Sequence, residues 1–314
     1  MKFTGIDIGG TKCAVISGSV ETGIQEKIKF ATTNVSETLE NIIKAVEKLG
    51  ECDAIGISCG GPLDSKRGII MSPPNLTGWD NVEIVKMLEE KFKVPTGIEN
   101  DANACALAEW KFGAGKGSQN MVFLTFGTGM GAGLILDGRL YSGTNDMAGE
   151  IGHMRMCDFG PVGYGKAGSF EGFCSGGGIA KLGKMLAEEK LQRGETTAFC
   201  KNRGELEQIT AKSIAECAKS GDADAIKVYD ICAEKLGMGI SVLIDILNPE
   251  KIVIGSVFER SEELLRDKME NVIKRETLLY SREVCEIVSA KLGDSIGDWA
   301  AIAVAENTLN KRDI

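Results

Sequence analysis

The sequence predicts a two-domain α/β protein in which one structural motif occurs twice. Its 314 residues are enough for two hydrophobic cores, and chains of this length usually divide into domains. Residues 3–17 and 122–136 each comprise an apolar strand, a turn of Gly and Thr, and a second apolar strand. This pattern predicts hairpins more than helices. After the first hairpin, amphipathic helices alternate with short apolar strands, as they do in an α/β domain.

The repeated turn is typical of a phosphate site. Glycine lets the backbone approach a ligand closely, and the N–H groups of such a turn, with a Thr hydroxyl, can surround phosphate oxygens. Glycine contributes 40 residues, about twice its average share. Because they cluster in a few turns, we favour a site built from backbone over a protein that is merely rich in loops. Two such turns predict a pair of jaws that close on one polyphosphate.

The expected elements of the first half are a helix capped by Ser36, a strand at 53–59, a helix at 81–92, a strand at 96–99 and a helix that contains Ala102 and Trp110. Those of the second half are a Gly-rich stretch at 160–178, helices near 179–192, 211–219 and 223–247, a strand at 251–255 and a helix at 299–309. Residues 113–118 are a predicted hinge, and 293–297 are a predicted second crossing. We therefore place an N-terminal domain at 1–115, with a terminal helix at 298–314 packing back on it, and a larger C-terminal domain at 116–297.

Composition argues against several classes of protein. A net charge of −9 disfavours a nucleic-acid surface. The ten cysteines form no Cys-x-x-Cys pair and lie mostly in apolar segments, which predicts buried thiols in a reducing cytoplasm. We expect neither a signal peptide nor a membrane span, since the start lacks a basic and apolar leader and no apolar run reaches 18 residues.

Familiar nucleotide and hydrolase motifs fail on their context. Each Gly-Lys pair is followed by Gly, Ala or Met, whereas a P-loop requires Ser or Thr. A relaxed dinucleotide fingerprint at 127–132 continues into a strand instead of a helix. The segment 56–60 matches a nucleophile elbow around Ser58, but the Gly-Gly-Pro that follows disfavours the helix which that elbow needs.

The segment Glu99-Asn-Asp-Ala-Asn-Ala104 is the strongest candidate for catalysis. Asp101 at a helix start is compatible with a simple N-cap. A cap needs only one side chain, however, and this turn brings several to the end of a strand, where α/β sites lie. The helix dipole should keep Asp101 ionised and ready to accept a hydroxyl proton, as phosphoryl transfer requires.

The segment Gly149-Glu-Ile-Gly-His153 contains the only histidine. A lone histidine is more often structural than functional. With Glu150 nearby and Glu171 after a Gly-rich loop, it predicts a set of hydrogen-bonding groups for a polyhydroxyl ligand.

In their order and spacing, these segments resemble the ROK family of bacterial sugar kinases and sugar-responsive repressors. The resemblance runs from Asp7 to about Ala303. It is carried by the two phosphate motifs, the catalytic segment, the sugar segment and the adenosine turn, which are here Asp7–Lys12, Phe126–Gly131, Glu99–Ala104, Ala148–His153 and Ile252–Ser256. It implies the actin/hexokinase-like (ribonuclease H-like) fold, with two domains and duplicated phosphate hairpins.

The resemblance also implies a function and a site. The function is ATP-dependent phosphorylation of a hexose or N-acetylhexosamine, as in glucokinases, by a cytoplasmic homodimer that uses Mg²⁺. Asp101 would be the general base and Asp7 the contact to Mg²⁺. The other implied sugar ligands are Gly61, Asn100, Glu150, His153 and Glu171. Gly9, Gly10, Thr11, Lys12, Thr128 and Gly129 would face the phosphates, and Gly177 and Gly255 the adenosine.

The chain departs from the family in one loop. Many members carry Cys-x-Cys-Gly-x-x-Gly-Cys-x-Glu after the histidine and bind a structural zinc. The three cysteine positions are here Val162, Tyr164 and Ser169, which are poor zinc ligands or none. We therefore expect no zinc, and a loop held by packing, with Tyr164 and Phe170 turned inward.

Two alternatives to a kinase stay open at this point. A sugar-sensing repressor would carry a helix-turn-helix segment before the first phosphate motif, but only four residues precede Gly5. A catalytically silent sugar sensor is disfavoured by the intact Asp101 and both phosphate turns. The sequence does not choose among glucose, N-acetylglucosamine, N-acetylmannosamine, allose and fructose.

Overall fold

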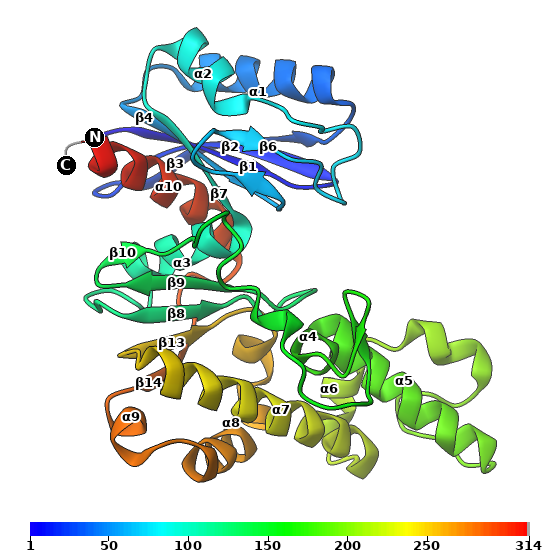
Figure 1. The fold of residues 1–314 in the computed structure, drawn as a ribbon. Coiled ribbons are helices and arrows are strands. Elements are labelled where there is room, and N and C mark those ends of the chain that lie inside the picture. Colours follow the sequence, from blue (N-terminus) through cyan, green and yellow to red (C-terminus); the bar gives the residue numbers. More distant parts are fainter. Residues whose placement is uncertain (313–314) are drawn as a thin grey trace. The chain divides into compact units, whose positions relative to one another are not determined.

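The computed structural model describes residues 1–312, which divide into two compact units (Figure 1). Within the described residues, the first unit comprises 1–119, 133–148 and 291–312, and the second comprises 120–132 and 149–290. The domain limits drawn from the sequence stay a prediction. They differ from these units mainly because 133–148 belongs to the first unit. The last two residues of the predicted terminal helix lie outside the described part of the chain.

The first unit is built on a five-stranded sheet of order β3-β2-β1-β4-β7. These strands are β3 (Gly23–Ala31), β2 (Lys12–Ser19), β1 (Phe3–Ile8), β4 (Ala54–Cys59) and β7 (Thr96–Asn100). The predicted hairpin is the antiparallel pair β1 and β2, whereas β1, β4 and β7 run parallel. In this register Ile8 lies beside Cys59, and Cys59 beside Asn100. The carboxyl ends of the three parallel strands therefore meet at one edge of the sheet.

Helices cover both faces of this sheet (Figure 1). One face packs against α1 (Val35–Leu49) and α2 (Ile84–Phe92), and the other against α10 (Ile296–Arg312). A row of three glycines, Gly5, Gly56 and Gly97, crosses β1, β4 and β7 in register beneath α10. A Cβ atom on Gly56 would lie 2.2 Å from the Ala301 oxygen and the Ala305 nitrogen. The glycine row thus allows the backbone of α10 to contact the sheet directly.

The remaining elements of this unit connect the sheet to its loops. Helix α3 (Asp101–Phe112) follows β7 and packs against α10. Short antiparallel pairs are formed by β5 (Leu63–Asp64) with β6 (Ile69–Ile70) and by β9 (Ala132–Leu136) with β10 (Arg139–Leu140). A 3₁₀ turn, η3 (Gly293–Ser295), precedes α10.

The second unit contains the parallel strands β8 (Met121–Leu124), β13 (Lys251–Ile254) and β14 (Glu286–Ser289), with β13 in the middle. Its helices are α4 (Phe170–Phe173), α5 (Gly176–Gln192), α6 (Ala211–Lys219), α7 (Ala223–Leu247), α8 (Val257–Glu276) and α9 (Leu279–Glu283). Helices α7 and α8 pack along one another (Figure 1). Smaller pieces are the hairpin β11 (Val162–Gly163) and β12 (Lys166–Ala167) and the 3₁₀ turns η1 (Ile151–His153) and η2 (Arg203–Gln208). Among the described residues, no helix is both long and apolar enough to cross a bilayer.

The N-cap of α1 corrects one prediction. The helix begins at Val35, and the Asn34 side chain accepts a hydrogen bond of 3.0 Å from the Glu37 nitrogen. Ser36, the predicted cap, lies inside the first turn. Asn and Ser are comparable caps, so the choice between them rested on residue type alone.

We therefore expect Asn34→Ala to lower the free energy of unfolding by about 0.5–2 kcal/mol, because an amide at the helix start loses its acceptor. Ser36→Ala is the matched control, since Ser36 is also exposed and lies in the same turn. It should change stability by less than about 0.5 kcal/mol. Urea unfolding of both variants measures the difference, and equal losses would contradict the observed cap.

Candidate functional site

A cavity of about 180 Å³ lies at the carboxyl edge of the sheet of the first unit. Residues at or just after the ends of three strands line it: Asp7 and Ile8 in β1 with Gly9 and Gly10 after it, Ser58 and Cys59 in β4 with Gly60 and Gly61 after it, and Asp101 after β7. Ligands of parallel sheets bind at this edge, because strand ends and loops converge there. The position of the cavity therefore follows from the parallel pairing of the strands.

The wall opposite the strand ends was not predicted. Pro73, Asn75 and Leu76 line the cavity from the loop after β6. A Cβ on Gly10 would lie 2.6 Å from the Asn75 oxygen, so this loop closes over the glycine turn. The Ser-Pro-Pro-Asn run at 72–75 was the available signal, because it marks a turn-rich loop with little freedom.

The first phosphate turn is a tight connection between β1 and β2. The Gly9 nitrogen donates to the Lys12 oxygen over 3.1 Å, and the Thr32 hydroxyl donates to the Gly9 oxygen over 2.6 Å. Gly9 and Gly10 line the cavity, as does the predicted sugar contact Gly61. Thr11 and Lys12 do not line it and are exposed on the same turn.

Asn100 caps helix α3, and Asp101 lines the cavity. Asn100 is the N-cap of α3, because its Oδ1 accepts a hydrogen bond of 2.7 Å from the Asn103 nitrogen. Asp101 is therefore not needed as the cap, and its carboxylate lines the cavity. Asn100 does not line the cavity, although its capping bond leaves the side-chain amino group uncommitted to the helix.

The charge state of Asp101 differs from the expectation. The Ala102 nitrogen donates to Asp101 Oδ1 over 2.9 Å and lowers the pKa of this carboxyl, as a helix start should. Crowding by protein atoms has the larger effect, so the pKa of Asp101 is raised overall. The side chain nevertheless stays exposed at the mouth of the cavity. A raised pKa makes the carboxylate a stronger proton acceptor.

Asp7 is the second carboxylate of the cavity. Burial, followed by repulsion from Asp298, raises its pKa to about 6, although Lys27 opposes this change. The Asp101 carboxylate also raises the pKa of Asp7. A carboxylate whose charge is disfavoured by a neighbouring carboxylate suits a divalent cation, which would relieve the repulsion. These residues therefore fit the magnesium ion that the predicted reaction requires.

A cysteine in the cavity offers no competing chemistry. Cys59 is 1% exposed, and burial raises the pKa of its thiol to about 12. A thiol with such a pKa stays protonated and unreactive near neutral pH.

The second unit contains the repeated phosphate turn. Residues 125–131 form a closed turn in which the Thr125 nitrogen donates to the Gly131 oxygen and the Gly127 nitrogen donates to the Gly129 oxygen, both over 3.0 Å. The Thr125 hydroxyl accepts from the Gly131 nitrogen over 3.0 Å. This bonding places Thr128 and Gly129 at the tip of the turn.

The two predicted adenosine glycines lie beside this turn. The Gly176 nitrogen, at the start of α5, donates to the Gly127 oxygen over 2.8 Å, and a Cβ on Gly177 would lie 3.4 Å from the Thr128 oxygen. The Gly255 nitrogen donates to the Leu124 oxygen over 3.0 Å. Helix α5 begins three residues earlier than predicted, so its N-terminus lies beside the turn, where the positive end of the helix dipole would favour an anion.

The predicted sugar segment packs against the same turn. A Cβ on Gly152 would lie 2.2 Å from the Met130 oxygen, which places η1 on the hairpin. Glu171, in the first turn of α4, accepts from the Met130 nitrogen through Oε2 over 3.1 Å. Glu150 directly precedes η1, and His153 ends it and is exposed. Glu171 therefore contacts the phosphate turn as well as belonging to the predicted sugar set.

The loop that lacks the zinc cysteines is held differently from the expectation. Phe170 is fully buried, as predicted, but Tyr164 is 74% exposed, so its predicted inward position is wrong. Cationic side chains bind backbone oxygens instead: Lys181 binds the Val162 oxygen over 2.6 Å, and Arg155 binds the Ala167 oxygen over 3.0 Å. In the described part of the chain, no group of three or more His, Cys, Asp and Glu side chains could hold a metal ion.

The raised pKa of Asp7 gives a testable dependence of stability on pH. The folded state retains the Asp7 proton up to about pH 6, whereas the unfolded chain releases it near 3.8. The folded state thus binds more protons between these values, so the free energy of unfolding falls as pH rises. Relative to the parent, Asp7→Asn should gain up to about 3 kcal/mol of stability between pH 4 and pH 7 in EDTA.

Denaturant unfolding at a series of pH values measures this gain. Glu51→Gln removes an exposed carboxylate and serves as the control, with no comparable trend expected. A stability difference between Asp7→Asn and the parent that does not vary with pH would contradict the perturbed Asp7.

Comparison with known proteins places the chain among characterised relatives. The sequence model of the ROK family matches residues 3–308. The glucokinase of Halalkalibacterium halodurans is 32% identical, and the match covers 98% of this chain and 97% of that protein. A ROK family glucokinase from Streptomyces griseus, solved with glucose and AMPPNP, is 28% identical with a TM-score of 0.75, covering 98% of this chain and 99% of that one. This likeness confirms the predicted fold class.

A transcriptional regulator is also similar to the chain. The xylose repressor of Caldicellulosiruptor bescii is 30% identical, and the match covers 92% of this chain and 74% of the repressor.

Proposed function

The chain belongs to the ROK family, and on that premise we propose that it is an ATP-dependent kinase of a hexose or N-acetylhexosamine, with Asp101 as the general base. One observation carries the proposal. The parallel strands of the first unit bring two carboxylates, Asp7 and Asp101, into one cavity with the Gly9-Gly10 turn. Glucokinases among the relatives, one of them solved with glucose and an ATP analogue, support the reaction class.

The reaction needs an oriented hydroxyl and a proton acceptor. In the proposed step, a sugar hydroxyl oxygen forms a bond to the γ-phosphorus of ATP as the bond from that phosphorus to the β-phosphate oxygen breaks. Asp101 accepts the hydroxyl proton, and ADP leaves. Asp7 would hold Mg²⁺, directly or through water, and the ion would supply charge neutralisation at the phosphates. Gly9 and Gly10, with Thr11 and Lys12 on the same turn, would bind phosphate oxygens.

We assign the predicted sugar ligands for each unit by itself. On the side of the first unit, Gly61 lines the Asp101 cavity and Asn100 keeps its amino group for a hydroxyl. From the second unit we assign Glu150, His153 and Glu171. One Glu171 oxygen is bonded to Met130 of the phosphate turn, which leaves the other to accept from the sugar. Glu171 would therefore link occupancy of the sugar site to the shape of the nucleotide site.

The nucleotide would be held by the second phosphate turn. Thr128 and Gly129 would contact the phosphates at the tip of that turn. The start of α5 at Gly177 and the turn at Gly255 lie beside it and would bind the adenosine side.

The similarity to a repressor favours a second function, a sugar-responsive regulator. The Asp101 carboxylate argues for the kinase, because hydrogen bonding to a sugar needs no base with a raised pKa.

We further propose a cytoplasmic location, consistent with ten free cysteines, and a loop at 157–170 that functions without zinc.

Asp101→Asn should reduce kcat by about 10²–10⁴-fold, because the amide accepts no proton. Sugar binding should change little, since the substituted side chain still offers an oxygen to the hydroxyl. Coupled ADP release and calorimetry measure the two effects. Asp222→Asn, at the N-cap of α7, is the control and should retain the parent rate, because Asn caps as well as Asp does. Near-parental turnover by Asp101→Asn would show that another group is the base.

An apolar face of the second unit is a candidate for assembly. A cavity of about 430 Å³ is lined by apolar side chains of α7 and of the segment that follows η1, including Met154, Met156, Met238, Val242 and Ile246. Ile246 is 73% exposed, and Leu278 and Tyr280, at the start of α9, are 69% and 82% exposed. Apolar side chains this exposed are typical of protein interfaces.

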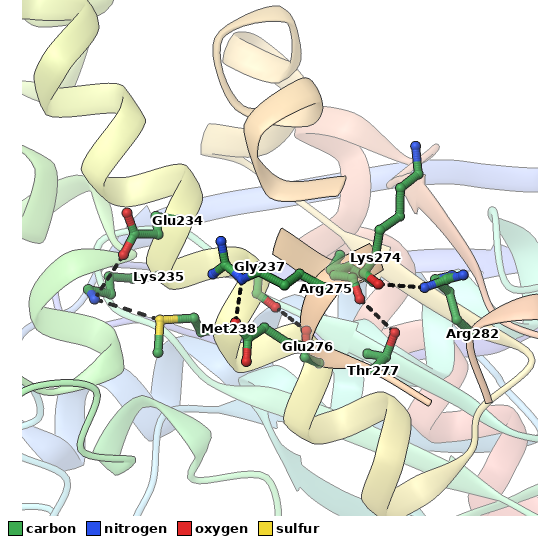
Figure 2. Close-up of polar contacts among 11 residues, drawn as sticks. Glu234, Lys235, Gly237, Met238, Lys274, Arg275, Glu276, Thr277 and Arg282 are labelled. Atoms are coloured by element: carbon green, nitrogen blue, oxygen red, sulfur yellow. Dashed lines mark hydrogen bonds and ion pairs between the residues drawn. The ribbon is translucent and has the colours of Figure 1, made fainter. Parts of the chain in front are cut away.

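Charged groups of both signs border this face. Arg155, Asp245 and Glu276 line the cavity together with the apolar residues. Figure 2 shows the polar contacts at the end of α8. The Arg275 guanidinium donates to the Glu276 carboxylate over 2.7 Å, and Arg282 of α9 donates to the Lys274 backbone oxygen over 2.8 Å. A face with both signs of charge can pair with a copy of itself around a two-fold axis. We therefore propose that a second copy of this chain covers it, giving a homodimer.

Ile246→Asp should convert the proposed dimer to a monomer, because it would bury a charge without a partner at the contact. Light scattering after size-exclusion chromatography gives the mass of each species. Ile226→Asp, at the start of the same helix and 38% exposed, is the matched control and should leave the mass unchanged. A monomeric parent, or a dimer that persists in Ile246→Asp, would contradict this interface.

A further inference from the structure

The hairpin of β11 and β12 holds an aromatic side chain in an unfavourable backbone conformation. Tyr164 and Gly165 form its turn, with φ angles of +42° and +77°. Turns with two positive φ angles favour Asn and Gly, and a bulky residue there is strained. Strain of this kind persists where the surrounding structure makes use of it. The ring is largely exposed, so burial in a core does not explain the choice of residue.

The Tyr164 ring contacts the only histidine of the chain. Its centroid lies 5.2 Å from that of His153, and the two ring planes are inclined by 79°. Aromatic pairs prefer this nearly perpendicular arrangement. His153 ends the short η1 turn and is itself exposed, so packing by a core does not orient the imidazole.

A second residue of the same hairpin holds the backbone of His153. The Lys166 ammonium donates to the His153 oxygen over 2.5 Å, a charge-assisted bond. The Met156 nitrogen donates to the Gly168 oxygen over 2.8 Å and ties the two chain segments together just beyond the histidine. The hairpin therefore contacts both the ring and the carbonyl of His153.

We propose that Tyr164 is a positioning residue, which holds the His153 imidazole in one orientation for the sugar and so sets sugar affinity. The inference rests on the proposed function, because it takes His153 as a sugar ligand. A side chain already held in its binding orientation loses less conformational freedom when the ligand arrives. Tyr164 would thus act on the sugar through His153, with no contact to the nucleotide.

The single histidine allows a direct test that does not need turnover. In ¹H–¹³C spectra, the imidazole signals of His153 should shift in Tyr164→Ala, because the neighbouring ring current is lost. Tyr164→Phe retains the ring and should keep the parent signals. The sugar KM, and the sugar Kd by calorimetry, should rise about 3- to 10-fold in Tyr164→Ala and recover in Tyr164→Phe, with the ATP KM unchanged. Phe159→Ala, in the same loop and 86% exposed, is the control and should alter none of these.

Two results would overturn the proposal. Imidazole signals that do not move in Tyr164→Ala would show that the contact does not exist in solution. Signals that move while sugar KM and Kd stay at the parent values, or equal losses of ATP and sugar affinity, would show that Tyr164 serves only the structure of the loop. Failure of the proposed function is a separate result: the parent itself would turn over no sugar, while the imidazole signals and the sugar Kd would still report on Tyr164.

Discussion

The contact between a helix and a row of glycines determines how the edge of the first unit that carries Asp7 and Asp101 is arranged. Gly5, Gly56 and Gly97 lie in register across three parallel strands, and α10 rests on them at backbone distance. A side chain at Gly56 would force the helix away from the sheet. The same register aligns the strand ends that carry Asp7, Gly60 and Asp101. The packing of α10 on the sheet and the placing of Asp7 and Asp101 at its edge therefore both depend on the register of β1, β4 and β7.

In the second unit, close packing also fixes the site segments, but the elements that pack are different. Its phosphate turn is closed by its own backbone bonds and is contacted by the start of α5 and by Glu171. Glycine at 152 allows η1 to lie against this turn, because a Cβ atom there would overlap the Met130 oxygen. The proposed nucleotide-binding and sugar-binding groups of this unit are thus parts of one packed structure. This arrangement gives a physical route by which sugar binding can act on the nucleotide site.

Much of this organisation could be predicted from the sequence, and the failures have identifiable causes. Glycine turns, the Asn-Asp pair and the lone histidine are local signals, so residue type and spacing were enough to propose the site segments, and Asp7, Gly9, Gly10, Gly61 and Asp101 do line one cavity. Strand β3 was missed because its charged edge residues obscure the alternation of a strand, and α8 because its charged residues hide its apolar face. The Ser36 cap and the inward Tyr164 were wrong because each depends on a neighbour that the sequence does not identify. For Asp101, the helix start was recognised, but the larger effect on its pKa comes from protein atoms that crowd the carboxyl and displace water, and these are brought there only by the fold.

The most direct test of the account is whether the purified protein transfers phosphate from ATP to a sugar. The parent should be incubated with ATP, Mg²⁺ and each of a panel of hexoses and N-acetylhexosamines, with ADP followed by a coupled assay and products by ³¹P NMR. The account predicts that at least one sugar yields ADP and a sugar phosphate ester in equal amounts. Sugar binding detected by calorimetry, with no ADP formed above the sugar-free rate for any member of the panel, would contradict it.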